Sequence, residues 1–213
     1  MPSVSEDNAC IPRHIDYVIS VASPWTYLGH ARFCQIVRRY GIGVRILPVD
    51  MVDVFNRTGG TVFRDRAIER RAYRQIELRR WSGSLAIPLT LEPAHYPVAH
   101  EPASRLILAA ADMGHDVLAL TGRILAAVWR HERDIADETT LFELAAVDIA
   151  DPRALLAHAA LLDIEAAYIA ATDEAVAKGV FGAPTYILEN ELFWGQDRLA
   201  FLEETLQNTT QPR

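Results

Sequence analysis

The chain contains little cysteine. Its 213 residues include two, Cys10 near the N-terminus and Cys34 within a helical pattern, and these form no CxxC pair. A dithiol redox site of the usual kind needs such a pair, so the sequence argues against disulfide exchange. Because disulfide frameworks belong to oxidising compartments, the reducing cytoplasm is the expected location.

Positive charge, long apolar runs and metal-ligand spacings are also scarce. The formal net charge of −7 and the pI near 5.5 argue against a nucleic-acid binder, whose contact surface is basic. No apolar run approaches the length of a membrane span, and no hydrophobic signal core follows the N-terminus, so we expect no membrane partner. We also expect no zinc site, because five histidines lack ligand spacing: His95, His100, His115, His131 and His158.

The first part of the chain predicts a β-α-β unit behind a flexible arm. Residues 1–13 are mostly polar, and we expect them to form the arm. Residues 14–21 are too apolar for an exposed strand and indicate a central strand covered on both faces. A helical pattern over residues 26–40 follows, opened by Ser23 as N-cap before a proline, and a second strand is predicted over residues 44–49.

The end of the chain predicts a β-β-α unit around a proline. Gly179 ends a helix, and residues 185–188 and 192–194 form two strands before a last helix. Pro184 stands directly before the first of these strands, where a cis bond would expose the backbone of Ala183 to a ligand. The local residues also fit an ordinary trans proline at a strand start, and by themselves they favour it.

Helical patterns fill the middle of the chain. They are predicted over residues 63–81, 103–113, 117–131, 141–147, 152–162 and 164–178. A β-α-β opening and a β-β-α closure, separated by helices, predict an α/β fold: a thioredoxin-like domain with a large all-helical insertion that acts as a lid. We place the thioredoxin-like domain at residues 14–60 plus 180–207 and the helical insertion domain at residues 61–179.

Three motifs together resemble a known family. They are Ser23-Pro-Trp-Thr-Tyr-Leu-Gly29, Thr172-Asp-Glu-Ala-Val-Ala-Lys-Gly-Val-Phe-Gly-Ala-Pro-Thr185 and Phe193-Trp-Gly-Gln-Asp-Arg-Leu199. In this order and spacing they resemble the 2-hydroxychromene-2-carboxylate isomerases, relatives of the kappa-class glutathione transferases in the DsbA-like branch of the thioredoxin fold. The resemblance runs from about residue 14 to residue 205, and the helical insertion falls where that family carries its helical domain.

The resemblance implies a glutathione site. Ser23 stands where a thioredoxin-like redox enzyme has its cysteine, and the resemblance implies that its hydroxyl donates a hydrogen bond to the glutathione sulfur. It implies that Ala183 and Pro184 present backbone groups to the peptide part of glutathione. It also implies that Gln196 and Asp197, at the start of the last helix, hold the γ-glutamyl end. Without the resemblance, the local sequence favours Ser23 as a helix cap alone, and the other residues fit at least as well as a turn and a capped helix start.

The predicted helix over residues 63–81 is rich in arginine. Arg66, Arg70 and Arg74 recur every four residues, so they are predicted to share one helical face. Most of the arginines are expected to lie on a solvated face. The exception is Arg70, because the resemblance places it where the family has a cationic glutathione ligand, often a lysine. Two aromatic residues of this segment, Tyr73 and Trp81, are expected in the core or lining the lid.

Gly60 marks a second departure from the family pattern. The family often has Thr-Gly-Asn after the second strand, whereas this chain has Thr58-Gly59-Gly60. Gly60 therefore stands at an expected glutathione-binding position, and the loss of the asparagine side chain favours an altered substrate.

The resemblance implies a glutathione-dependent isomerase that acts on an aromatic carboxylate in aromatic hydrocarbon catabolism, as a homodimer. In that reaction glutathione adds to the substrate, the ring opens, a bond rotates, and elimination returns glutathione. Two alternatives stay open: a kappa-like glutathione transferase acting on another electrophile, and a non-catalytic ligand-binding protein that has kept the fold. This interpretation predicts that Ala183–Pro184 is cis and faces Ser23 across a shared cleft.

Overall fold

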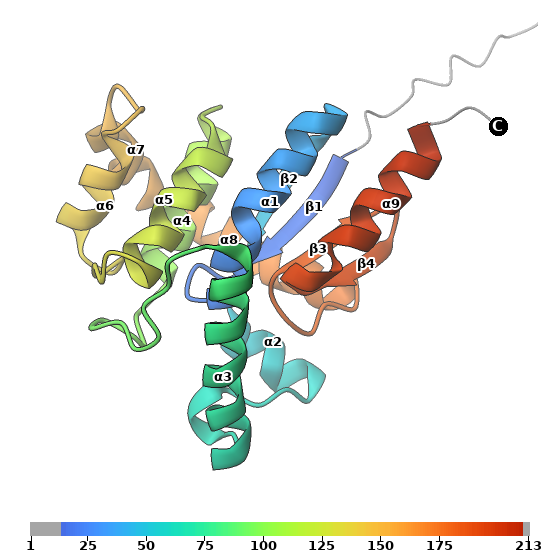
Figure 1. Cartoon of the computed structure of the whole chain (residues 1–213). Coiled ribbons are helices and arrows are strands. Elements are labelled where there is room, and N and C mark those ends of the chain that lie inside the picture. The colour runs from blue at the N-terminus through green and yellow to red at the C-terminus, as the bar shows by residue number, and fades with distance from the viewer. Residues whose placement is uncertain (1–13, 211–213) are drawn as a thin grey trace, which may run out of the picture.

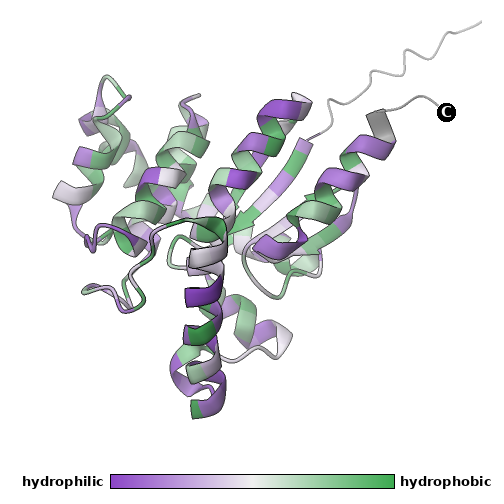
Figure 2. Cartoon of the chain, in the orientation of Figure 1, coloured by the Kyte–Doolittle hydropathy of each residue, from purple (hydrophilic) through white to green (hydrophobic). Residues whose placement is uncertain are grey.

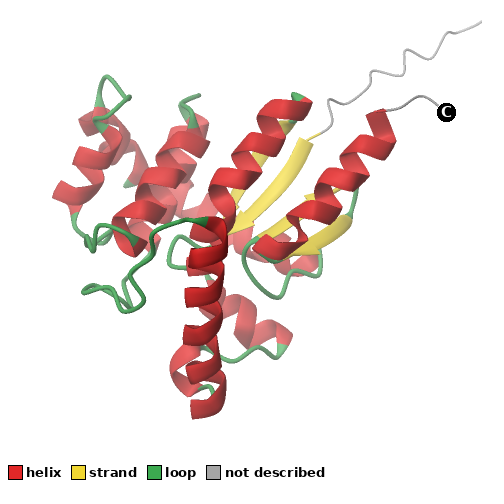
Figure 3. Ribbon diagram, viewed as in Figure 1, coloured by secondary structure: helices red, strands yellow, loops and turns green. Residues whose placement is uncertain are grey.

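A four-stranded mixed sheet organises the fold. The computed structural model of the protein describes residues 14–210, with the strands in the order β2-β1-β3-β4 (Figure 1, Figure 3). β1 (His14–Ile19) pairs in parallel with β2 (Gly43–Pro48) and antiparallel with β3 (Thr185–Leu188). β3 in turn pairs antiparallel with β4 (Glu191–Trp194). Residues 14–48 and 185–194 therefore contribute to one sheet, as the predicted thioredoxin-like fold requires.

Helices cover the sheet and form the middle of the chain. In chain order the elements are α1 (Pro24–Tyr40), α2 (Met51–Thr58), the 3-10 turn η1 (Phe63–Asp65), α3 (Ile68–Leu85), α4 (Glu101–Asp112), α5 (Val117–Trp129), α6 (Glu138–Ala145), α7 (Pro152–Ala159), α8 (Leu162–Ala177), the 3-10 turn η2 (Gln196–Arg198) and α9 (Leu199–Thr210). In Figure 1, α1 and α9 lie in front of the sheet, α4 to α7 are grouped beside it, and α2 and α3 project from the body.

The two faces of β1 contribute to different cores, because successive side chains of a strand point to opposite faces. Ile15 and Tyr17 pack toward α1, where the ring centroid of Phe33 lies 4.3 Å from that of Tyr17. Val18 packs on the other face with Ala171 of α8. The predicted central strand is thus confirmed.

The structure differs from the sequence prediction at α2, which was not predicted, and at the start of α3. No helix was predicted over α2, although Asp50 caps it by accepting from the amide of Val52 at 2.8 Å. The arginine-rich helix begins at Ile68 instead of residue 63, after the short turn η1. Arg66 therefore precedes α3, and the prediction that it shares a helical face with Arg70 and Arg74 is wrong. Hydrophilic residues nevertheless recur along α3 (Figure 2).

The predicted start of the last helix is also corrected. Gln196 and Asp197 lie in the 3-10 turn η2, and α9 begins only at Leu199. The expected arm, residues 1–13, lies outside the described residues and includes Cys10. The two-domain division stays a prediction; α4 and α8 of the predicted insertion pack directly on β2.

Apolar helices occur in the middle of the chain. Within residues 14–210, no single helix is long and apolar enough to span a membrane; α7 and α8, bent by 66° at their junction, pass the length and composition criteria only as a pair.

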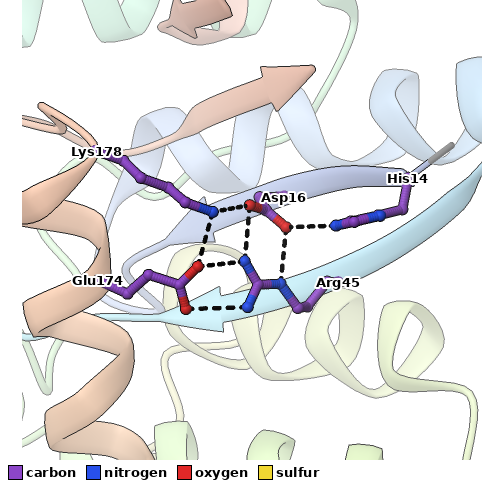
Figure 4. Close-up of polar contacts among 5 residues, drawn as sticks. All are labelled: His14, Asp16, Arg45, Glu174 and Lys178. Carbon is purple, nitrogen blue, oxygen red and sulfur yellow. Dashed lines mark hydrogen bonds and ion pairs between the residues drawn. The ribbon is translucent and has the colours of Figure 1, made fainter. Parts of the chain in front are cut away.

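A network of charged side chains joins α8 to the sheet (Figure 4). Asp16 of β1 is buried and accepts two hydrogen bonds of 2.8 Å from Arg45 of β2 and one of 2.5 Å from Lys178. Glu174 of α8 pairs with both cations, and His14 lies 3.2 Å from Asp16. Burial alone would raise the pKa of Asp16, but the hydrogen bonds from Arg45 and Lys178 lower it to about 2.

Candidate functional site

A large cleft opens where α1 begins. Its volume is about 1350 Å³, compared with roughly 300–1,000 Å³ for typical small-molecule pockets. One side comes from the start of α1 and from the segments before β3 and after β4. The other walls come from α2, α3 and the extended connection after α3. The cleft therefore has room for more than one small ligand.

Ser23 lines this cleft at the N-terminus of α1. Its Oγ accepts a hydrogen bond from the amide of Thr26 at 3.3 Å, so the predicted N-cap is confirmed. The same hydroxyl donates to the carbonyl oxygen of Ala183 at 3.3 Å. Hydrogen bonds between oxygen atoms are usually about 2.5–3.0 Å long, so this one is weak. The single hydroxyl proton is therefore easily redirected to a ligand in the cleft.

The backbone before β3 faces Ser23. The Ala183–Pro184 bond is cis, and Ala183 lines the cleft, so the predicted cis bond facing Ser23 is confirmed. Gly182 allows Trp194 to lie against this turn, because a Cβ at Gly182 would sit 2.3 Å from Trp194 Nε1. A real Cβ never approaches another atom so closely, so the ring would have to move aside if any side chain were added at this position.

Gln196 and Asp197 also line the cleft. Gln196 is buried and packs closely on α1, where a Cβ at Gly29 would lie 2.8 Å from Gln196 Cβ. Asp197 is exposed and accepts a hydrogen bond of 2.6 Å from Arg198. Its carboxylate is therefore already paired with one cation, and a ligand ammonium would have to share it.

Two of the predicted site residues do not line the cleft. Arg70 is exposed on α3, whereas its neighbour Arg71 lines the cleft. Gly60 is exposed, and its amide donates to the carbonyl of Phe55 at 2.9 Å. A Cβ at Gly60 would lie 2.3 Å from Phe55 Cδ1, so an asparagine there would require the ring to shift. Because Phe55 lines the cleft, Gly60 affects its shape indirectly.

Sequence analysis missed the cationic side of the cleft. We define the arginine wall as Arg66, Arg71 and Arg74, which line the cleft from the residue directly after η1 and from α3. Arg66 Nε donates to the carbonyl of Thr61 at 2.8 Å, and its guanidinium lies over the Phe55 ring. The signal that could have found this wall is the helical spacing of Ile68, Arg71 and Gln75, because all three line the cleft.

Arg74 lies among aromatic rings. Its guanidinium carbon is 4.4 Å from the centroid of Phe63 and 5.9 Å from that of Tyr96. Burial lowers the pKa of Arg74, the Tyr96 side chain raises it, and the charge of Arg66 lowers it. Because the unperturbed value is so high, Arg74 stays cationic at neutral pH.

The cleft has no thiol from the described part of the chain. Cys34, the cysteine within residues 14–210, is buried away from the cleft, and burial raises its pKa to about 11. Residues 14–210 also contain no cluster of His, Cys, Asp or Glu suited to a metal ion. A hydroxyl at the start of α1 thus takes the position that suits an activated thiolate.

The chain matches a known protein family over nearly all of its described residues. Residues 14–207 match the model of the DSBA-like thioredoxin domain. The chain belongs to the DSBA-like thioredoxin domain family. The match includes every element that contributes to the sheet and to the cleft, so the confirmed fold and the family agree.

Among the relatives of this DSBA-like protein are curated enzymes named 2-hydroxychromene-2-carboxylate isomerase. The one from Pseudomonas putida is 28% identical over 198 residues, covering 90% of this chain and 93% of its own length. One from Pseudomonas sp. (strain C18) is 29% identical over 206 residues, covering 92% of each. These relatives support an isomerase within the DSBA-like family.

Solved structures of similar fold include enzymes of two kinds. A 2-hydroxychromene-2-carboxylate isomerase matches with a TM-score of 0.79 and 24% identity, covering 92% of this chain and 95% of that one. The cytosolic disulfide reductase DsbM from Pseudomonas aeruginosa with GSH matches with a TM-score of 0.65 and 21% identity, covering 91% and 99%. At these identities the likeness shows the DSBA-like fold alone.

Proposed function

We propose that the protein is a glutathione-dependent isomerase that acts on 2-hydroxychromene-2-carboxylate or a closely related aromatic carboxylate. The observation that carries the proposal is the Ser23 hydroxyl at the N-terminus of α1, facing Ala183 in a cleft that no cysteine of residues 14–210 lines. The names of the relatives support the isomerase reaction, and the structure of DsbM with GSH supports glutathione as a ligand of this fold.

The residues of the cleft fit glutathione. Ser23 has a hydroxyl proton held only by the weak bond to Ala183, and Ala183 exposes backbone to the cleft. In this proposal Ala183 and Pro184 contact the peptide part of glutathione, while Gln196 and Asp197 hold the γ-glutamyl end. Asp197 would then divide its carboxylate between Arg198 and the ligand ammonium.

We include Arg70 and Gly60 in the proposed glutathione site because they lie close to the cleft in sequence. Arg70 is next to Arg71, which lines the cleft, and Gly60 is two residues before Val62, which also lines it. Arg70 would reach a carboxylate of glutathione by changing its side-chain rotamer, because it is exposed in this structure.

Ser23 is the proposed catalytic residue. Bound glutathione supplies a thiolate that adds to the conjugated substrate and leaves again, without net oxidation or reduction. Ser23 turns its proton from Ala183 toward that sulfur. A hydrogen bond to a charged group contributes about 1.5–3 kcal/mol, which corresponds to a thiol pKa lowered by about one to two units. The N-terminus of α1 favours the same negative charge.

The direct test is an assay with thiol-free protein. Glutathione or 2-mercaptoethanol is added at equal thiolate concentration, isomerisation is followed by ultraviolet absorbance, and free thiol is titrated at the end. We expect turnover with glutathione, a much lower rate with mercaptoethanol because it lacks the positioning contacts, and full recovery of free thiol. Lasting consumption of thiol would point to a transferase, and full activity without thiol would contradict the proposal.

We also propose that the protein is a homodimer and that it acts in the cytoplasm. Of the residues of α3, only Leu78 is buried, while Ile68, Tyr73 and Ile76 expose large apolar side chains. A second copy covering part of this helix would remove that surface from water. Light scattering on the wild type and on Ile76→Glu tests this, because a dimer built on α3 dissociates in the variant. The cytoplasm is proposed because it is the reducing compartment that keeps thiols free.

A further inference from the structure

We propose that the arginine wall, Arg66, Arg71 and Arg74, binds the carboxylate of the aromatic substrate. The inference rests on the proposed function for the identity of the substrate, and on the cleft itself for the site. It assigns the part of the cleft around Ser23 to glutathione, and the arginine wall to the second ligand.

The cleft carries positive charge that no carboxylate of the described residues neutralises at the arginine wall. The cleft is lined by five arginines and three carboxylates, in a protein whose net charge is −7: Arg64, Arg66, Arg71, Arg74, Arg198, Glu77, Glu92 and Asp197. Within residues 14–210, none of the three guanidinium groups of the wall has a carboxylate within ion-pair distance. Partly buried charges without a counter-ion are costly, and an anion placed between them removes that cost.

Three buried polar side-chain atoms of the cleft have no partner among the described residues. Arg71 Nε, Gln75 Oε1 and His100 Nε2 have no hydrogen-bond partner among the described residues, and all three side chains line the cleft. The nearest carboxylate oxygen to His100 Nε2, on Asp50, is 3.9 Å away. Buried polar groups in native proteins nearly always have a partner, so these atoms indicate an absent ligand or water. Arg71 and Gln75 are one helical turn apart, so both can reach the same ligand.

Aromatic rings surround the arginine wall. The arginines alternate with aromatic rings that also line the cleft, namely Phe55, Phe63, Trp81 and Tyr96. Arg66 and Arg74 already lie over three of these rings, so guanidinium groups and ring faces are presented together. An aromatic acid matches this surface, because its ring packs on the aromatic faces while its carboxylate accepts paired hydrogen bonds from a guanidinium.

The test measures binding directly and needs no turnover. Calorimetry without thiol compares 2-naphthoate with 2-naphthamide, which has the same ring system but no charge. We expect the wild type to bind naphthoate at least about tenfold more tightly than naphthamide, since charge-assisted hydrogen bonds are roughly twice as strong as neutral ones. Arg71→Gln should remove that preference. Arg79→Gln is the matched control, because Arg79 lies on the same helix, is exposed and does not line the cleft.

A second variant covers the case in which Arg71→Gln disturbs the helix. Arg71→Lys keeps the charge but not the paired donors, so it should bind naphthoate with intermediate affinity. Equal affinity for naphthoate and naphthamide in the wild type, or full retention of the preference in Arg71→Gln, would overturn the inference.

Steady-state kinetics separates the substrate from glutathione as the source of the carboxylate. For the isomerase, Arg71→Gln should raise KM for the aromatic substrate and leave KM for glutathione within about twofold. A raised KM for glutathione alone would assign the wall to the cofactor and refute the inference. If no isomerisation occurs while naphthoate binding depends on Arg71, the proposed function fails and the carboxylate site stands.

Discussion

Ser23→Ala separates the structural role of this residue from its chemical role. The substitution removes the hydroxyl that accepts from the amide of Thr26 and donates to Ala183, both at 3.3 Å. Losing an N-cap costs about 1 kcal/mol of unfolding free energy, which leaves a protein of typical stability folded. Losing the hydrogen-bond donor to the thiolate should raise the thiol pKa of bound glutathione by about one to two units.

Asp151→Ala is the matched control for the cap. Asp151 caps α7 by accepting from the amide of Ala154 at 2.9 Å, and it does not line the cleft. Asp151→Ala should lower the unfolding free energy by a similar amount and leave the pKa of the bound glutathione thiol unchanged. Chemical denaturation measures the stability of both variants, and ultraviolet titration of the bound thiolate measures its pKa. An unchanged pKa in Ser23→Ala would reduce Ser23 to a helix cap and refute the catalytic role.

Three further outcomes are expected. Asp16→Asn should lower the unfolding free energy at neutral pH by several kcal/mol. The pKa of Asp16 is depressed from 3.8 to about 2 in the folded state, so the difference in unfolding free energy between Asp16→Asn and the wild type should narrow as the pH falls from about 4 to about 2. Denaturant titrations at several pH values measure this difference. Gly182→Ala should cost about 1–3 kcal/mol and weaken glutathione binding, since the new Cβ displaces Trp194; calorimetry with glutathione checks this, and unaltered affinity would contradict it. Arg70→Gln should raise KM for glutathione and not for the aromatic substrate, and no change in either constant would remove Arg70 from the site.

The parts of the fold that follow from local chemistry were predictable. Ser23 as a cap and the strand after Pro184 were found where the sequence indicated them, because capping and proline geometry act over a few residues. The helix α2, which was not predicted, has local signals of the same kind, because Asp50 before it and Gly59 after it are ordinary start and stop signals.

The cationic wall of the cleft was not predictable in the same way. Arg70, Arg71 and Arg74 lie within about one turn of α3, and their spacing alone does not say which of them faces the cleft. The family pattern singled out Arg70, but it contains no information on the helical phase, so Arg71 and Arg74 emerged only from the structure.

The pairing of β1 with β3 has a consequence for how the protein forms during synthesis. Asp16 pairs with Ile187, so one edge of β1 stays unpaired until the chain has left the ribosome as far as residue 187. Contacts of such long sequence separation form late and slowly. The helices between them have local contacts and can form earlier. We therefore expect the half of the cleft built by Ala183 to be completed last, and a nascent chain that still lacks β3 to expose an open strand edge to chaperones.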